Sequence, residues 1–526
     1  MLAVALLAAS GSGARAAALP PWIPPAIEPV RLTPCVASGK GRDITVGPGK
    51  THAEVTQVPW ETLGPGDTVR IFWRAAPYRG KFLISARGTA AAPVRVCGVR
   101  NTDGRRPVIS GENAVSRPEL AGAYGGDDYT VTWTEGRGIV YVGLNRNTDV
   151  WTDHPSHLRI DGLAFQKAHP NYTFTDTTGK TRAYVDFGAA IWIHRGWNIT
   201  IADNEITDSS HAIFSRSIAD TAADFEVTRD LRIAYNDMSG NGIVGDEHVH
   251  TTYVQSRRVT YEFNRYGPLR SGAPGNSIKD RSTGTVIRYN RIEDGAHAVD
   301  LVEPEDWNTV AEADPAFRVT LVYGNQILKD GRTGSAIHYG GDHMGAEAHF
   351  RKGTLYFYAN TLHLSGRDYA ALFQASTVDE RIVAWNNIFF PEAGTDPYGN
   401  PTALQIRANQ DNADGIADGG RVDLGRNWIW RGWTDNGPWG KPIGGRLTGT
   451  GNLVVGSAYP VDLTAMVPVL GSGAVDRAVA RPTDYSAVVA AHPVDRELVR
   501  LADGRFQPAA RPVVGAAPDF GARERR

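Results

Sequence analysis

Residues 276–303 hold the densest group of side chains that can exchange protons. Ile278-Lys279-Asp280-Arg281 is followed 21 residues later by Val299-Asp300-Leu301-Val302-Glu303, and both runs place a charged residue after an apolar one. If the two runs pair as parallel strands, they lie ~4.8 Å apart. Lys279 then lies beside Asp300, with Arg281 two residues along on the same face. A cation beside a carboxylate on outward-facing strands indicates a possible functional site.

These runs belong to a repeat that extends in both directions. An asparagine, usually with an apolar residue two places later, recurs as Asn204, Asn236, Asn264, Asn290, Asn325, Asn360, Asn386 and Asn427. One repeat with loops of variable length is typical of a solenoid rather than of separate globular domains. Asparagine suits a tight bend because it tolerates the left-handed conformation, and stacked asparagines can also hydrogen-bond to one another. The repeat predicts an all-β parallel solenoid of about ten coils.

The repeat also predicts which residues face outward. The expected inward positions are nearly all apolar, as a dry core requires: Ile213, Thr252, Ile278, Val299, Ile337, Leu372 and Leu404. The residues that follow them form a first outward column, which contains Phe214, Tyr253, Lys279, Asp300, His338, Phe373 and Gln405. A second column, two residues further along, contains Arg216, Gln255, Arg281, Val302, Gly340, Ala375 and Arg407.

The residue types at the centre of these columns fit β-elimination on a uronic-acid polymer. That reaction needs a group that neutralises the uronate carboxylate, a base that removes the α-proton and an acid that protonates the leaving oxygen. We expect Arg281 to neutralise the charge, and Lys279 and His338 to act as base and acid or to exchange these roles. Asp300 would orient both, although its charge favours the protonated amine and so opposes Lys279 as the base.

The flanking positions suit a sugar polymer. Aromatic rings along a groove can stack on sugars, and guanidinium groups bind carboxylates through two hydrogen bonds. The expected substrate-binding residues are Arg216, Phe214, Tyr253, Gln255, Glu303, Phe373 and Arg407. Simpler interpretations stay open: Lys279 and Asp300 can form an ion-pair ladder between coils, and the aromatic residues can pack under loops.

Residues 63–94 carry a resemblance to a known group of proteins. Leu63-Gly64-Pro65-Gly66-Asp67-Thr68-Val69, followed by Gly88-Thr89 and Pro93-Val94, is similar to the first coil of secreted right-handed parallel β-helix proteins. These include polysaccharide lyases of the chondroitinase B and alginate lyase type. The resemblance implies a right-handed β-helix and supports Lys279, because such lyases place a lysine on an equivalent coil. They pair it with an arginine one coil on, where this chain has Asp300.

Cofactors and other activities are left open by the sequence. Calcium is a candidate ligand of Glu303, Glu305 and Asp306, or of Asp342 with His343, which are equally interpretable as solvated loop residues. His248-Val249-His250 has a spacing that could hold a metal on a strand but lacks a third ligand. The alternatives to a lyase are a glycoside hydrolase using Asp300, Glu303 and Asp342, and a non-catalytic carbohydrate-binding or structural solenoid.

The remaining sequence predicts an exported protein. Residues 1–18 are interpreted as a signal peptide, 19–41 as an extended arm, 42–450 as the β-helix and 451–526 as a tail that packs on or caps it. Cys35 and Cys97 are the only cysteines, and we expect them to form a disulfide in the secreted or periplasmic protein. The net charge of −2 argues against nucleic-acid binding. No membrane span is expected, and we expect a monomer that acts on an acidic polysaccharide.

Overall fold

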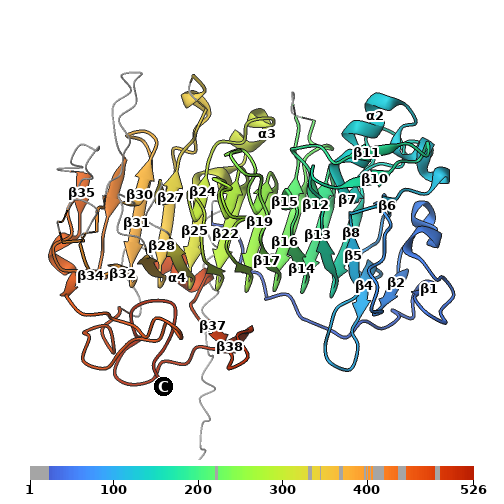
Figure 1. The fold of residues 1–526 in the computed structure, drawn as a ribbon. Helices are drawn as coiled ribbons and strands as arrows, with labels where there is room; N and C mark the ends of the chain where they lie inside the picture. The colour runs from blue at the N-terminus through green and yellow to red at the C-terminus, as the bar shows by residue number, and fades with distance from the viewer. Residues whose placement is uncertain are drawn as a thin grey trace, which may run out of the picture.

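The chain winds through three parallel β-sheets, and most turns of the winding contribute a strand to each sheet. The computed structural model describes residues 23–526 except 220–222, 330–333, 344, 366–370, 396–398, 400, 403, 407–419, 436–445 and 480–485. Figure 1 shows the turns stacked in chain order, from the blue N-terminal end to the orange C-terminal end. The predicted parallel β-helix is therefore confirmed.

Within the described residues the three sheets contain thirteen, nine and eleven strands, so they give no single number of coils. The first sheet consists of β1 (Asp43–Val46), β2 (Thr68–Phe72), β4 (Val94–Val99), β8 (Ser156–Asp161), β13 (Trp197–Ala202), β16 (Arg229–Ala234), β19 (Arg257–Glu262), β22 (Thr283–Arg288), β25 (Val319–Tyr323), β28 (Thr354–Tyr358), β31 (Arg381–Trp385), β33 (Arg421–Asp423) and β35 (Leu447–Thr448). The second consists of β3 (Phe82–Ile84), β7 (Gly138–Val142), β12 (Ala189–Ile193), β15 (His211–Ser215), β18 (Thr252–Val254), β21 (Ile278–Asp280), β24 (Val299–Leu301), β27 (Ser335–Tyr339) and β30 (Ala371–Ala375). The third consists of β5 (Val108–Ser110), β9 (Ala164–Gln166), β14 (Glu205–Thr207), β17 (Asp237–Ser239), β20 (Arg265–Tyr266), β23 (Arg291–Ile292), β26 (Gln326–Lys329), β29 (Thr361–Leu364), β32 (Ile388–Pro391), β34 (Trp428–Trp430) and β36 (Val454–Gly456).

Smaller elements lie outside these sheets. Helices α1 (Ala121–Tyr124), α2 (Asp128–Trp133) and α3 (Asn308–Glu312) belong to loops between coils, and α4 (Ser486–Ala491) precedes the antiparallel pair β37 (Arg496–Arg500) and β38 (Phe506–Ala510). A short sheet joins β6 (Ala114–Val115), β10 (Thr173–Thr175) and β11 (Thr181–Ala183). In Figure 1, α2 and α3 lie on one side of the stack, and α4, β37 and β38 lie on the other. Among the described residues, no helix is long and apolar enough to cross a membrane.

An asparagine ladder connects the coils. Asn290 donates to the side chain of Asn325 and accepts from that of Asn264, with Nδ2–Oδ1 distances of 3.0 Å in both cases. The ladder comprises Asn204, Asn236, Asn264, Asn290, Asn325, Asn360, Asn387 and Asn427. The expected stacking is thus confirmed, but Asn386 is the wrong member. The left-handed conformation belongs to the residue before the ladder asparagine, as at Tyr289 and at Asn386 itself, each with φ of 57°.

Both ends of the described chain pack on the outside of the first sheet. The predicted disulfide is confirmed: Cys35 in the arm is bonded to Cys97 in β4. Nearer the N-terminal end of the arm, the Ile27 carbonyl oxygen accepts a hydrogen bond from Arg288 of β22. From the C-terminal segment, the His492 carbonyl oxygen accepts a 2.7 Å hydrogen bond from Tyr358 of β28. The proposed signal peptide, residues 1–18, lies outside the described residues.

Candidate active site

Lys279, Asp300 and His338 occupy one outward column on three neighbouring strands of the second sheet. Lys279 of β21 is paired in register with Asp300 of β24, which is paired with His338 of β27. The inward residues beside them are apolar core residues: Ile278, Val299 and Ile337. The structure therefore brings together the central residues that the repeat predicts.

The predicted register is wrong by one residue at the next strand. Phe373 of β30 pairs with Ile337 and is buried in the core, so it cannot bind a substrate in this groove. Gln374 takes the outward position beside His338. The run Ala371-Leu372-Phe373 is continuously apolar, so alternation gives no signal for choosing its inward residue.

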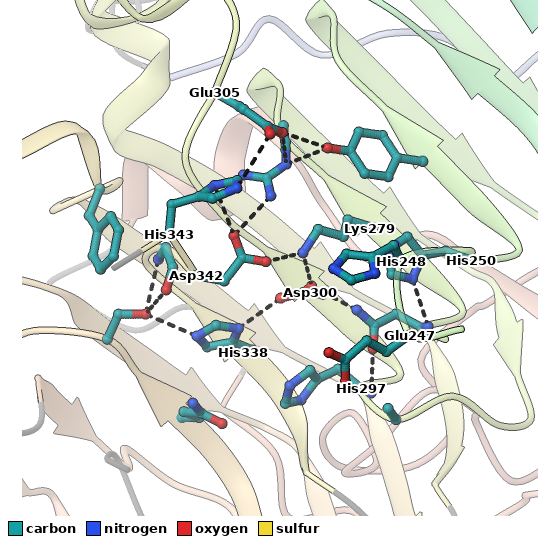
Figure 2. Close-up of a pocket in the computed structure, with 18 of the residues that line it drawn as sticks. Glu247, His248, His250, Lys279, His297, Asp300, Glu305, His338, Asp342 and His343 are labelled. Atoms are coloured by element: carbon teal, nitrogen blue, oxygen red, sulfur yellow. Dashed lines mark hydrogen bonds and ion pairs between the residues drawn. The ribbon is translucent and has the colours of Figure 1, made fainter. Parts of the chain in front are cut away.

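A cavity of about 740 Å³ lies over this column. Its lining includes Lys279, Arg281, Asp300 and His338, together with His250, His297, Asp342 and Ser376. Figure 2 shows Lys279, Asp300, His338 and Asp342 with their side chains directed toward one another. This volume suits a sugar unit with its linkage, because small-molecule pockets measure roughly 300–1,000 Å³.

Lys279 is held between two carboxylates. Its Nζ donates a 2.8 Å hydrogen bond to Asp300 Oδ2 and pairs with Asp342 as well. Burial alone would lower the pKa of Lys279, but the charges of Asp300 and Asp342 raise it above its ordinary value. Burial likewise opposes ionisation of Asp300, yet Lys279 and His338 hold the pKa of that carboxyl well below its usual range. Lys279 is therefore a protonated ammonium at neutral pH.

Arg281 has a full set of partners. Its guanidinium contacts Glu303, Glu305 and Asp342 at N–O distances of 3.3, 3.1 and 2.8 Å, and Nε donates to the Tyr253 hydroxyl at 2.8 Å. Burial lowers the pKa of Arg281, but Tyr253 and the three carboxylates outweigh burial and raise that pKa above its ordinary value. The two cations are thus surrounded by four carboxylates, which leaves the cavity with excess negative charge.

His338 connects Asp300 to a serine that the sequence did not indicate. His338 Nδ1 lies 2.8 Å from Asp300 Oδ1, and Nε2 lies 2.9 Å from Ser376 Oγ. Asn276 donates to the other oxygen of Asp300 at 2.7 Å. Ser376 also accepts from the Gly341 N–H at 2.9 Å and lies 2.7 Å from the Gly341 carbonyl oxygen.

The aromatic part of the column is covered rather than open. Phe214 stacks between Trp192 and Tyr253 at centroid distances of 3.9 and 5.1 Å. Side chains around α1, including Tyr124, join Phe214 in one buried cluster, with Phe187 packed against it. Phe214 is only 4% exposed, so it does not offer a sugar-stacking face. Tyr253 does line the cavity, where its hydroxyl lies 2.7 Å from Glu305.

The other residues expected to bind substrate, where the structure describes them, lie outside the lining of the cavity. Arg216 lies 3.3 Å from His194, and Gln255 is buried and donates to Asp306 at 3.2 Å; neither lines the cavity. Glu303 is buried beneath the cavity, where its carboxylate accepts from the backbone N–H groups of residues 342 and 343. Arg407 lies outside the described residues.

Two groups of metal-type side chains occur among the described residues. They are Glu303 with Asp342 and His343, and His297 with Asp300 and His338, and the possible ligand atoms of each group lie within 4.8 Å of one another. The first group includes the Asp342–His343 pair proposed from the sequence and is the one with two carboxylates, as calcium prefers. His248 is an exposed neighbour of Asp246 and does not share such a group with His250.

Sequence reasoning gave Asn276, His297 and Ser376 no role and did not place Asp342 beside Lys279, because these residues lie outside the repeat positions. Asp342 follows β27 in a loop, Asn276 precedes β21, His297 precedes β24 and Ser376 follows β30. Each lies one to three residues beyond a strand of the column. A search of the residues that flank repeated strands would have found them, although their contacts depend on loop geometry that the repeat does not determine.

No protein-family model matches this chain, and no curated protein matches it. Several solved structures do. An alginate lyase from Paenibacillus sp. str. FPU-7 is 15% identical, with a TM-score of 0.35 over 65% of this chain and 92% of that chain. A PL6 family alginate lyase, AlyGC, is 11% identical, with a TM-score of 0.31 over 86% of this chain and 53% of that chain. The structure of an AlyGC mutant is 10% identical, with a TM-score of 0.34 over 89% of this chain and 55% of that chain. The matched part therefore spans about half of the AlyGC chain.

Proposed function

We propose that this protein is a carbohydrate-active enzyme that cleaves a uronate-containing polysaccharide by β-elimination. The observation that carries the proposal is the column of Lys279, Asp300 and His338 inside one cavity. It supplies an acid and a potential base about two strand spacings apart, roughly 10 Å measured across the strands, with the side chains linked through Asp300.

The geometry favours one assignment of the two proton-transfer roles. Lys279 is held protonated by Asp300 and Asp342, so it suits the acid that protonates the leaving oxygen. His338, whose Nδ1 faces Asp300, suits the base, with Nε2 toward the cavity residue Ser376. This is the exchanged form of the sequence-based assignment, and the reason is the second carboxylate, Asp342.

Neutralising the substrate carboxylate is the demanding step. Arg281 is already paired with three carboxylates, so an anionic sugar here needs further positive charge. Glu303, Asp342 and His343 are the residues that would hold calcium, and their two carboxylates fit that ion. The ion would supply the charge that acidifies the α-proton.

A glycoside hydrolase is the second candidate, because Asp300 and Asp342 both face the cavity. It is less well supported. A hydrolase needs one carboxylic acid with a raised pKa to protonate the leaving group, whereas the cationic partners lower the pKa of Asp342 to about 2 and hold that of Asp300 well below its usual range. A third candidate, a non-catalytic binding protein, leaves the buried charged column without a role.

The decisive experiment is a screen of alginate, glycosaminoglycans, pectate and bacterial exopolysaccharides, with and without calcium. β-Elimination produces an unsaturated uronate that absorbs in the ultraviolet, and Lys279→Met should reduce its formation at least about 100-fold. Lys50→Met, at an exposed lysine on the first coils, is the matched control. New reducing ends without this absorbance would identify a hydrolase, and the absence of both products with every polymer would contradict catalysis.

We also infer that the protein works outside the cytoplasm, as a monomer. The Cys35–Cys97 disulfide supports the location outside the cytoplasm, because such bonds persist in oxidising compartments. Fractionation of producing cells, with thiol labelling of the unreduced protein, would test the location.

A further inference from the structure

Ser376, His338 and Asp300 are connected in the order that nucleophilic acyl transfer requires. Ser376 Oγ is 2.9 Å from His338 Nε2, and His338 Nδ1 is 2.8 Å from Asp300 Oδ1. In such an arrangement the imidazole accepts the hydroxyl proton, and the carboxylate orients the ring and stabilises its positive charge. The three groups come from β24, β27 and the residue after β30, so the sheet register fixes their order.

Asp300 is held firmly for this role. Asn276 Nδ2 and Lys279 Nζ donate to its Oδ2 at 2.7 and 2.8 Å, which leaves Oδ1 directed at the imidazole. A donor on each side of the carboxylate restricts its rotation. The ring of His338 is thereby held with Nε2 toward Ser376.

The surroundings of Ser376 suit a small acyl group. Gly341, Phe350 and Ala375 line the cavity with Ser376 and give it an apolar wall. Phe350 packs so closely on Gly341 that a Cβ added there would lie 2.0 Å from the ring. The Gly341 N–H donates to Ser376 Oγ at 2.9 Å, so a backbone donor lies beside the position where an oxyanion would form.

We propose that Ser376, His338 and Asp300 form a nucleophilic triad that removes small acyl groups, such as acetyl, from carbohydrate hydroxyls. A neutral ester suits this cavity better than an anion does, because the carboxylates around Lys279 and Arg281 outnumber the cations. This activity goes beyond β-elimination and does not depend on it.

The chemical steps balance without a cofactor. Ser376 Oγ attacks the ester carbonyl carbon while its proton moves to His338 Nε2, and the carbonyl electrons move to the oxygen beside the Gly341 N–H. The C–O bond to the sugar then breaks, and the sugar oxygen takes the proton from Nε2. Water repeats the attack with His338 as the base and releases acetate and free Ser376.

The test uses the full-length protein and an alkyl fluorophosphonate, which forms an adduct only with an activated serine. Peptide mass spectrometry should locate the adduct on Ser376. His338→Asn should slow labelling at least about 100-fold. Ser335 is the internal control: its Oγ lies 3.2 Å from His297 Nδ1, but that nitrogen donates to the Ser335 carbonyl oxygen at 2.8 Å and so cannot accept the hydroxyl proton.

The second measurement is acetate release from an O-acetylated polysaccharide. Release should be lost in Ser376→Ala and retained in Ser335→Ala. An unlabelled Ser376 in the wild-type protein would overturn the triad and leave the serine as a clamp for the Gly341 loop; equal acetate release by wild type and Ser376→Ala would do the same. Acetate release without unsaturated uronate would instead support the triad and contradict the proposed lyase.

Discussion

At the scale of single residues, Asp300 organises the cavity. Its two oxygens receive hydrogen bonds from Asn276, Lys279 and His338, although it is only 2% exposed. A buried carboxylate without such donors would be neutral. The same side chain therefore keeps Lys279 charged and orients His338, and both proposed activities depend on it.

Replacing Asp300 with asparagine should show whether its negative charge, rather than its volume, is required for activity. Asp300→Asn keeps the volume but removes the negative charge, so we expect the rates of β-elimination and of acetate release to fall at least about 100-fold. Steady-state assays of both products check this. Asp237→Asn on β17 of the third sheet, which weakens an ion pair with Arg265 on the neighbouring strand β20, should change neither rate. Near-wild-type rates in Asp300→Asn would contradict its central role.

At the scale of elements, the repeat predicts which residues of a strand point inward and which point outward wherever polar and apolar residues alternate. Ile278-Lys279 and Val299-Asp300 alternate clearly, and the structure pairs them as expected. Around Phe373 the alternation disappears, and the prediction is wrong by one residue. The covering of Phe214 also could not be predicted, because the covering side chains around α1 lie some ninety residues earlier in the chain and no pattern links the two segments.

The asparagine ladder should be a main source of stability between coils. Asn290 is fully buried, donates to the Tyr261 and Asn325 oxygens and accepts from Asn264. Asn290→Ala leaves several buried groups without partners, each costing about 1–3 kcal/mol. We expect the free energy of unfolding to fall by about 3 kcal/mol or more in urea titrations.

Its control is the exposed Asn452, which lies outside the ladder. Asn452→Ala should change the free energy of unfolding by less than about 0.5 kcal/mol. If the two variants lose similar stability, the ladder is not the stabilising feature.

The disulfide should stabilise the N-terminal coils. It closes a loop with a sequence separation of 62 residues, for which the loss of chain entropy in the unfolded state corresponds to about 4 kcal/mol. Replacing both Cys35 and Cys97 with serine should lower the midpoint of thermal unfolding measured by circular dichroism. Reductant should lower the midpoint of the wild type but not that of the double variant; an unchanged wild-type midpoint would contradict the stabilising role.

At the scale of the whole molecule, the two ends of the chain meet on the first sheet. His492 Nε2 lies 2.6 Å from the Pro24 carbonyl oxygen, and its carbonyl oxygen accepts from Tyr358. The C-terminal residues Val488 and Leu498 belong to the same buried cluster as Ile23 of the arm. The arm and the C-terminal segment therefore cover several coils together on the first sheet, whereas the cavity lies over the second.

The contact between His492 and Pro24 should make the free energy of unfolding depend on pH. Burial lowers the pKa of His492 to about 4, against 6.5 for the free side chain. As pH falls below about 6.5 the unfolded chain binds a proton that the folded chain excludes, so stability is lost progressively down to about pH 4. This shift in pKa corresponds to a loss in the free energy of unfolding of at most about 3 kcal/mol.

His492→Gln can still donate a hydrogen bond to the Pro24 carbonyl oxygen but does not titrate. Urea titrations at pH 7, 5.5 and 4.5 should therefore show a shallower loss of stability in this variant than in the wild type. His248→Gln, at an exposed histidine, should follow the wild type, and parallel curves for all three proteins would contradict the role of His492.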